Sequence, residues 1–258
     1  MKNGYCRICG LYRPLSFEHV PPKAAFNNSR VKVASFNEVI GKGPNEILQG
    51  KISQRGRGDY TLCERCNNRT GKWYAPDFIE WCFQSALLIK QTNGNPTLFY
   101  LHYLFPLRII KQIVVMFFSV NHSGFRLTYP ELEKFVLNKE RRFFDPNIHI
   151  YAYYNIEGGS RTSGIVARGT FGYSSPILFS ETNFPPLGFV MTYNSKPPDN
   201  RLVDISHFAT YAYDEFKIMT IKLPVLPTHL WYPGDYRTKK EIEDNYQRNV
   251  SNTKKTNS

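Results

Sequence analysis

The stretch TLCERCNNRTG, residues 61–71, contains the second of two Cys-x2-Cys pairs in this chain. Its cysteines are Cys63 and Cys66, and the first pair, in the stretch CRIC, consists of Cys6 and Cys9. Two residues between cysteines allow a tight turn to direct both thiolates at one ion, and two such pairs complete a tetrahedral Zn²⁺ site. We predict a structural zinc ion here, because four protein ligands leave no open position for a substrate. A redox-active pair is the alternative.

The net charge of the 258 residues is +12, and the excess is concentrated in the N-terminal part. Residues 1–75 contain 13 Lys and Arg against five Asp and Glu, a net charge of +8. This distribution favours a polyanionic partner. A generally basic protein without such a partner is the other interpretation. The same segment has few long apolar runs, so we expect it to need a metal ion to fold.

The apolar segments of the sequence do not have the pattern of a signal peptide or of a membrane-spanning helix. The stretch MKNGYCRICG lacks the apolar run of a signal peptide. The most apolar run, residues 107–120, is interrupted by Arg108, Lys111 and Gln112, whereas a membrane-spanning helix needs about 18 or more apolar residues. We therefore expect a cytoplasmic protein without membrane contact, whose cysteines bind metal and do not form disulfides. Cys82 is expected to be a buried core residue.

The composition changes near residue 76, and we predict an α+β fold with two domains. Residues 1–75 would form a small zinc-binding domain, and residues 76–245 a larger α+β domain with an antiparallel sheet. The role of the larger domain would be targeting, dimerisation or sensing, and residues 246–258 would be a disordered polar tail. Apolar periodicity predicts helices over 76–91, 103–120 and 128–140, and strands over 147–156, 163–173, 175–181, 187–194 and 215–225.

Between the cysteine pairs, residues 17–22 have the sequence FEHVPP, an acidic residue followed by histidine and then by two prolines. The order Cys-x2-Cys, acidic-His-x-Pro and Leu-Cys-x2-Cys-Asn resembles the HNH endonucleases with the zinc-stapled ββα-metal fold. Among these, the phage endonuclease VII type resembles the chain most closely. The resemblance covers about residues 5–75.

The resemblance implies a phosphodiester hydrolase that acts on DNA and leaves 5′-phosphates. Glu18 and Asn67 would bind one catalytic Mg²⁺ or Mn²⁺, and His19 would be the general base that activates the attacking water. A hard cation with oxygen ligands suits the neutralisation of a phosphate and its leaving oxygen. An unperturbed histidine has a pKa close to neutral, as a general base requires.

The two prolines predict where the strand that carries Glu18 and His19 ends. Neither Pro21 nor Pro22 can donate to a β-ladder, so the strand should end just after His19 and leave it at an open edge. Adjacent residues of a strand point to opposite faces. Glu18 and His19 can therefore serve one site only if the backbone is irregular there, or if the site lies at the end of the strand.

A helix that begins near Cys66 would place Asn67 in its first turn, where the helix dipole and free N–H groups favour a phosphate. A helix cap is the other role open to Asn67. We expect the nucleic acid contacts to come from basic residues around this position, with a solvated surface as the alternative: Lys23, Arg55, Arg57, Arg65 and Arg69.

One part of the family pattern is missing. The family often has a further Asn shortly before the second cysteine pair, which orients the base. Here that stretch, GRGDYTLC, offers Asp59 and Thr61 as the polar candidates. Either a backbone carbonyl orients His19 instead, or the site is less active. The stretch KISQRGRG, residues 51–58, is expected to be a flexible loop that closes on a nucleic acid backbone or is merely solvated.

Two further functions remain beside a DNA endonuclease. The chain could be a zinc-stapled nucleic-acid-binding or regulatory protein that keeps the scaffold without hydrolysis, or a nuclease directed at RNA. A role of the endonuclease in restriction or antiviral defence follows only by analogy with nucleases that combine an HNH module with a larger domain.

Overall fold

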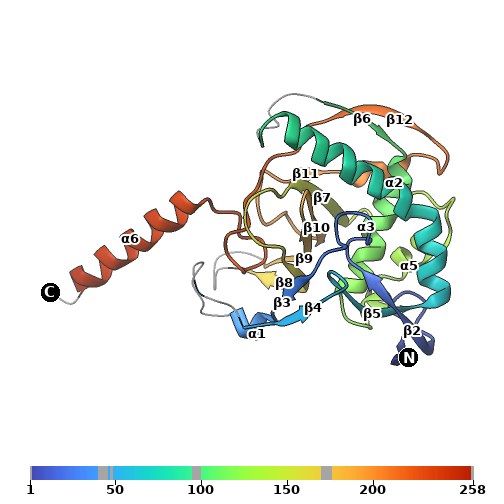
Figure 1. The fold of residues 1–258 in the computed structure, drawn as a ribbon, viewed down its shortest axis with the longest axis horizontal. Helices are drawn as coiled ribbons and strands as arrows, with labels where there is room; N and C mark the ends of the chain where they lie inside the picture. The colour runs from blue at the N-terminus through green and yellow to red at the C-terminus, as the bar shows by residue number, and fades with distance from the viewer. Residues whose placement is uncertain (1, 40–45, 47–48, 95–99, 170–175, 257–258) are drawn as a thin grey trace.

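The computed structural model describes residues 2–39, 46, 49–94, 100–169 and 176–256, which form a mixed α+β fold with antiparallel sheets (Figure 1). The strands are β1 Lys2–Tyr5, β2 Tyr12–His19, β3 Val31–Val33, β4 Lys51–Ser53, β5 Gly58–Cys63, β6 Tyr100–Leu104, β7 Ile148–Tyr154, β8 Thr162–Arg168, β9 Ile177–Phe184, β10 Leu187–Tyr193, β11 Val203–Asp204 and β12 Lys217–Ile221. The helices are α1 Phe36–Val39, α2 Glu64–Gln91, α3 Pro106–Val120, α4 Phe125–Thr128, α5 Pro130–Leu137, the 3₁₀ helix η1 Ser206–Thr210 and α6 Lys239–Thr256.

Helix α3 lies at the centre of the hydrophobic core. Pro106 at its first position has the backbone angle that a helix start requires. Almost every side chain of α3 is buried, including Lys111, whose Nζ donates to the carbonyls of Phe135 (2.5 Å) and Asn138 (2.7 Å) at the end of α5. The core position that its apolar composition predicts is thus confirmed. No helix in the described part of the chain is both long and apolar enough to cross a membrane.

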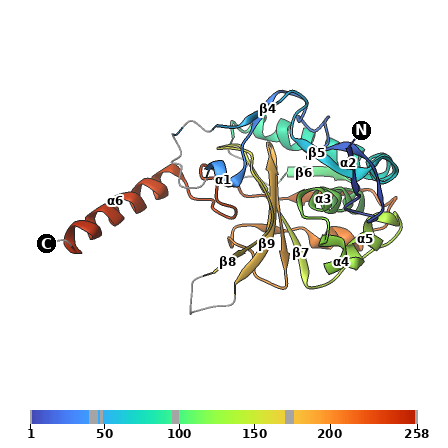
Figure 2. The same cartoon turned by 90° about the horizontal axis from the view of Figure 1, so that it is seen from below.

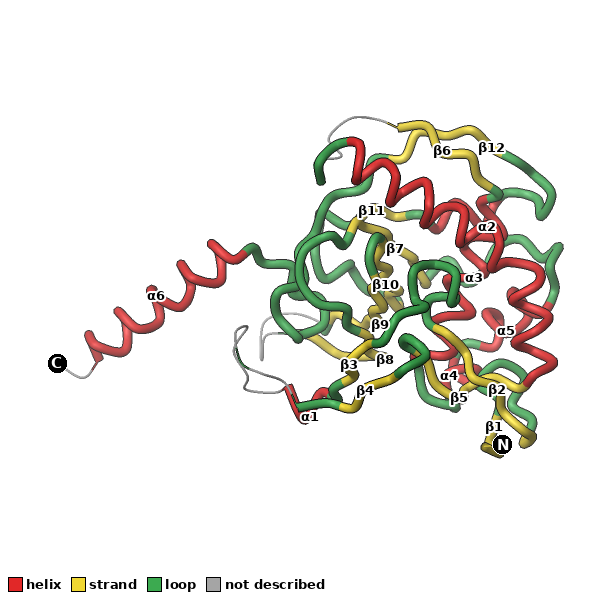
Figure 3. The backbone as a smooth tube through the Cα atoms, in the orientation of Figure 1, coloured by secondary structure: helices red, strands yellow, loops and turns green. Residues whose placement is uncertain are grey.

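Helix α2 is longer than the sequence predicts. We expected one helix to begin near Cys66 and another at Pro76, but a single helix runs through both positions and packs against α3 (Figure 3). An internal proline costs a helix about 3 kcal/mol. The buried stripe continues across it at helical spacing, from Thr70 and Tyr74 to Phe78 and Trp81, and burial of such large side chains offsets a cost of that size.

The five-stranded antiparallel sheet has the order β11-β7-β10-β9-β8. Both of its faces are covered, as the alternation in β7 shows. Ile150, Ala152 and Tyr154 point into the main core, whereas Tyr151 and Tyr153 belong to a second cluster with residues of the C-terminal segment. The predicted strands over 147–156, 187–194 and 215–225 are confirmed, as is the strand over 175–181, of which residue 175 lies outside the described residues. So is the strand over 163–173, of which residues 170–173 lie outside the described residues.

The N-terminal part contributes a three-stranded antiparallel sheet with the order β1-β2-β5. Strand β5 leads directly into α2, and both β2 and β5 pack against this helix. Helix α2 crosses residue 75, where the composition predicts a domain boundary, and one hydrophobic core contains residues from both sides of that position. The division into two domains, and oligomerisation through the second, stay predictions of the composition.

Two segments differ from the expected loop and tail. Residues 51–53, expected in a flexible loop, form β4 and pair with β3, while residues 40–45 and 47–48 of the same insertion lie outside the described residues. Residues 246–256 of the expected tail continue α6, which projects from the rest of the molecule (Figures 1 and 2), and residues 257–258 lie outside the described residues. A reciprocal capping box starts this helix: Glu241 N donates to Thr238 Oγ1 (3.2 Å) and Thr238 N donates to Glu241 Oε2 (2.7 Å).

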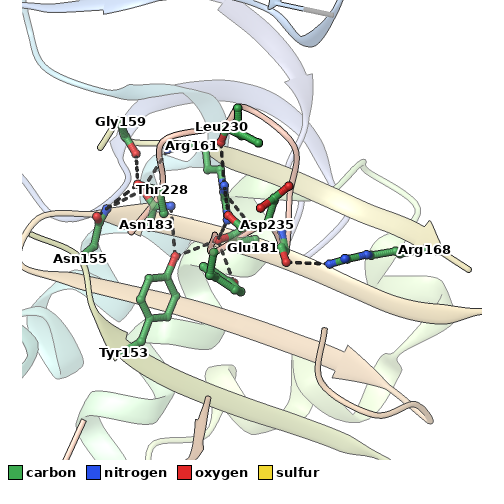
Figure 4. Close-up of polar contacts among 12 residues, drawn as sticks. Tyr153, Asn155, Gly159, Arg161, Arg168, Glu181, Asn183, Thr228, Leu230 and Asp235 are labelled. Atoms are coloured by element: carbon green, nitrogen blue, oxygen red, sulfur yellow. Dashed lines mark hydrogen bonds and ion pairs between the residues drawn. The ribbon is translucent and has the colours of Figure 1, made fainter. Parts of the chain in front are cut away.

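A buried ion pair connects the sheet to the C-terminal segment (Figure 4). Glu181 of β9 accepts from Arg161 Nε (2.9 Å), and its oxygens also accept from Tyr153, Tyr236 and the backbone N–H of Gly234. Arg161 donates in turn to the carbonyls of Leu230 and Asp235. The side chains of Arg161 and Glu181 are 6% and 0% exposed. Each charge in this pair is therefore compensated, and the pair fixes residues 230–235 on the sheet.

The buried pair predicts a large loss of stability for Glu181→Gln. The variant keeps the shape of the side chain but leaves the guanidinium of Arg161 as a buried charge without its counter-ion. The free energy of unfolding should fall by about 3–5 kcal/mol, measured by urea denaturation. Lys134→Ala, which breaks the exposed pair with Glu131, is the control and should change stability little. Equal effects of the two variants would contradict this account of the network.

Candidate metal centre and active site

The four predicted cysteine ligands come together. The sulfur atoms of Cys6, Cys9, Cys63 and Cys66 all lie within 4.8 Å of one another, and Cys9 Sγ is 3.9 Å from Cys63 Sγ. Thiolates bound to one Zn²⁺ at about 2.3 Å stand about 3.8 Å apart. The cluster could therefore bind a structural metal such as zinc. All four are free cysteines.

Local turns aim each pair of sulfurs at the same point. After β1, Cys6 N donates to Leu11 O (3.0 Å) and Gly10 N donates to Cys6 O (2.8 Å), which closes a tight turn around the first pair. Gly10 has φ of +69°, a conformation that glycine adopts without strain. The second pair spans the end of β5 and the first turn of α2. A metal held here would therefore join three segments, β1, β5 and α2.

The thiols influence one another before any metal binds. The hydrogen bond from Cys66 lowers the pKa of Cys6 to about 4, and the same bond raises the pKa of Cys66. Cys82 lies elsewhere, fully buried in α2, and burial raises the pKa of its thiol. The expectation that Cys82 is a core residue is confirmed.

Strand β2 ends at His19, as the prolines predict, and its second half lies at an open edge. On one side, β1 pairs only with Tyr12–Leu15 among the described residues. On the other side, β5 pairs along the strand to His19, with a register irregularity between Ser16 and Phe17. Of the two conditions named for a shared Glu18–His19 site, the strand end is therefore present, whereas the register irregularity lies earlier in the strand.

Glu18 and Asn67 are brought into contact. Asn67 lies in the first turn of α2, and its Nδ2 donates to Ser16 Oγ (3.0 Å) on the same strand as Glu18. Glu18 is 7% exposed, and burial raises its pKa to about 8 against the opposing effect of a hydrogen bond from the Asn67 side chain. No Lys or Arg among the described residues shifts this pKa electrostatically. Glu18 is thus a buried carboxyl without a cationic partner in that part of the chain.

His19 is held by a backbone carbonyl. Its Nε2 lies 2.8 Å from the carbonyl oxygen of Arg55, and its ring packs edge-on against Phe17 with centroids 4.9 Å apart. Burial lowers the pKa of His19, and the positive charges of Lys23 and Arg55 lower it further, while the bond to the Arg55 carbonyl raises it. Of the two alternatives for the missing asparagine, the carbonyl is the one observed.

The polar side chains expected near His19 have other partners. Asp59 forms an exposed ion pair with Lys2 (3.8 Å), and Thr61 Oγ1 donates to Ser119 Oγ (3.0 Å) in the core. Neither of these two interactions involves His19.

The five basic residues expected to bind nucleic acid differ in their surroundings. Lys23, Arg55 and Arg65 are exposed, and the guanidinium of Arg69 lies over the ring of Trp73 at 5.5 Å. Arg57 differs from the expectation, because its side chain donates to Val20 O (2.7 Å), Asn183 O (2.5 Å) and Thr182 Oγ1 (3.0 Å). It is engaged within the chain.

Sequence reasoning did not find Asn27, which is fully buried beside this arginine. Its side chain binds the backbone of Pro21 and Arg57. The residue lies in a polar stretch with no motif around it, so no pattern distinguishes it from a surface asparagine.

The chain matches no protein-family model, and it matches no curated protein and no solved structure at significant similarity. The metal centre and the His19 site are therefore interpreted from their own residues and geometry.

The cysteine cluster predicts about one zinc ion per chain. Metal analysis of the purified protein should find zinc in the wild type and lose it in Cys63→Ser, because a serine hydroxyl is a poor substitute for a thiolate ligand. Chelation should lower the thermal stability, since metal binding contributes directly to folding. Cys82→Ser is the matched control and should retain zinc. A wild type without zinc, or equal zinc in Cys63→Ser, would reject the site.

Proposed function

We propose that this protein is a divalent-metal-dependent endonuclease of the HNH type that hydrolyses DNA phosphodiester bonds. The observation that carries the proposal is a pair of contacts made by consecutive residues at the end of β2. Glu18 contacts Asn67 there, and the next residue, His19, has its ring fixed by a backbone carbonyl. The cysteine cluster supports it, because Cys66 immediately precedes Asn67 and so links the possible zinc site to these contacts.

The residues at this point fit a hard divalent cation. A buried carboxylate is costly unless it is paired or bound to a metal, and Glu18 has no such partner among the described residues. The amide of Asn67 supplies the second oxygen once it is rotated by 180°, which exchanges two atoms of nearly equal shape. Bound there, Mg²⁺ or Mn²⁺ would neutralise charge on the scissile phosphate and its leaving oxygen.

His19 is suited to accept a proton from water. A carbonyl can only accept a hydrogen bond, so Nε2 carries the proton that is donated to Arg55 O, and Nδ1 keeps its lone pair. In the proposed reaction Nδ1 takes a proton from water as the water oxygen bonds to phosphorus. The P–O3′ bond breaks, which leaves a 5′-phosphate and a 3′-oxygen that receives a proton from solvent.

Exposed basic side chains support a nucleic acid substrate. Lys23 and Arg55 are close enough to His19 to affect its pKa, so a phosphate beside the imidazole would lie in their field. Arg65 is exposed in the same first turn of α2 as Asn67. Contacts of this kind hold the phosphate backbone without reading sequence. Arg57 is left out of this set, because its donors are already bonded.

The proposed base predicts that His19→Ala loses DNA nicking while it keeps DNA binding. With plasmid DNA and Mg²⁺ or Mn²⁺, the cleavage rate should fall by about 10²- to 10⁴-fold, the usual contribution of a general base. His149→Ala, which changes an exposed histidine paired with Asp204, is the control and should cleave at the wild-type rate.

Two results would count against parts of this proposal. Cleavage that survives in His19→Ala would reject the base, and cleavage at the wild-type rate by Glu18→Gln would reject the metal ligand. If wild type and His19→Ala bind DNA equally and neither nicks it, the protein is a binding module and not a nuclease.

The proposed phosphate contacts predict a change in the salt dependence of binding. Each phosphate contact contributes about 0.9 to the slope of log K against log salt for duplex DNA. The double variant Lys23→Ala, Arg55→Ala should therefore reduce that slope by about 2, measured by fluorescence anisotropy across a salt series. Lys217→Ala is the control, because Lys217 is paired with Glu215, and its slope should match the wild type. An unchanged slope in the double variant would remove both residues from the interface.

A further inference from the structure

We propose that Arg57 is a positioning residue that fixes the imidazole of His19 by anchoring two segments to strand β9: Val20, which follows His19, and the turn at residues 55–57, which supplies the carbonyl bound by the imidazole. This inference rests on the proposed role of His19 as the base, although its central test is independent of catalysis. It assigns a task to the C-terminal sheet, which would hold the base in place.

Arg57 contacts the residue that follows His19 in two ways. Its Nε donates to Val20 O (2.7 Å), and its own carbonyl accepts from Val20 N (3.0 Å). Arg55, whose carbonyl binds the ring of His19, precedes it by two residues. The position of Arg57 therefore sets both the backbone next to the imidazole and the acceptor for its Nε2.

The side chain of Asn27 links the same two segments, the residues that follow His19 and the turn that contains Arg57. Its Nδ2 donates to Pro21 O (2.8 Å) and Arg57 O (2.7 Å), and its Oδ1 accepts from Arg57 N (2.6 Å). Gly56, between the two arginines, has φ of +82°, and a Cβ there would lie 2.3 Å from Asn27 O. The turn that presents the Arg55 carbonyl thus fits closely against Asn27.

The far end of Arg57 reaches the sheet. Nη1 donates to Asn183 O (2.5 Å), Nη2 donates to Thr182 Oγ1 (3.0 Å), and the guanidinium lies 5.3 Å from the ring centroid of Phe184. These three residues are consecutive in β9. They directly follow Glu181, the carboxylate of the buried network, and Asn183 Nδ2 also donates to Tyr153 Oη (3.1 Å) in that network (Figure 4). The anchor is therefore a rigid part of the fold.

Arginine is the side chain that can make this set of contacts. Its planar guanidinium carries donors in several directions, whereas the single nitrogen of lysine could not reach Val20 and β9 together. The acceptors are neutral carbonyl and hydroxyl oxygens. Replacement of Arg57 by methionine consequently leaves no counter-ion buried without its partner.

The test is the tautomer of His19, observed by ¹H–¹⁵N correlation of the histidine ring nitrogens at one neutral pH. The chain has six histidines, and the signals of His19 are assigned as those lost in His19→Gln. In the wild type the Nε2–H tautomer should dominate. Arg57→Met should give a mixture of tautomers and, with DNA and metal, a kcat at least about tenfold lower at unchanged KM, as expected for loss of orientation.

Two further variants separate positioning from charge and from conservative replacement. Arg55→Ala removes an exposed positive charge but keeps the carbonyl that binds His19, so the tautomer should stay as in the wild type. Arg57→Lys keeps the positive charge without the fork of donors, and should give an intermediate mixture. A wild-type tautomer in Arg57→Met would overturn the proposal, whether or not the wild type cleaves DNA.

Thr182→Val keeps the test open if Arg57→Met does not fold. Valine preserves the shape of threonine and removes the hydroxyl that accepts from Nη2. This variant should mix the tautomers to a smaller extent. If Arg57→Met is unfolded and Thr182→Val leaves the wild-type tautomer, the proposal is wrong. Failure of the wild type to cleave DNA, with the tautomer shifts as expected, would reject the nuclease and leave the positioning role intact.

Discussion

The convergence of four thiols is the constraint on which the N-terminal part of the structure depends. Cys63 ends β5 opposite Leu15 of β2, and Cys66 lies in the first turn of α2. A metal at this cluster would fix where the helix begins relative to both strands. Because Asn67 is the next residue along the helix, the same constraint sets its amide beside Ser16 and Glu18. Two cysteine pairs thus determine the place of two side chains that belong to neither pair.

Two glutamates are buried in the part of the chain that the structure describes, and their surroundings differ in a way that bears on function. Glu181 has a guanidinium, two phenol hydroxyls and a backbone N–H as partners, so its charge is compensated within the fold. Glu18 is also buried, but among the described residues only the Asn67 amide opposes the effect of burial on its pKa. A carboxyl that serves the fold is normally satisfied by the fold. The raised pKa keeps Glu18 neutral near pH 7, and the divalent cation proposed at this position would supply the compensating charge of the ionised form.

Local patterns could be predicted from the sequence, and long-range contacts could not. The cysteine spacing, the strand end at His19 and the strands after residue 147 depend on residues that are close together in the sequence. Periodicity and turn chemistry therefore suffice to find them. Pro76 was misleading, since its local effect is to start a helix and the burial that keeps α2 continuous comes from α3. The partner of Arg57 is 126 residues away at Asn183, and no local signal marks such a contact. The start of α6 is marked by the capping box at Thr238, a local signal that composition alone does not register.

The Arg57 contact also bears on the division of the chain at residue 75. Composition separates a basic N-terminal part from an apolar remainder, and a zinc-stapled module could in principle act alone. Yet the loop that holds His19 is bonded through Arg57 to β9, and β9 is bonded through Glu181 to the C-terminal segment. A general base is useful only when its lone pair is held toward the proton it must accept. If His19 is that base, the catalytic unit includes the sheet.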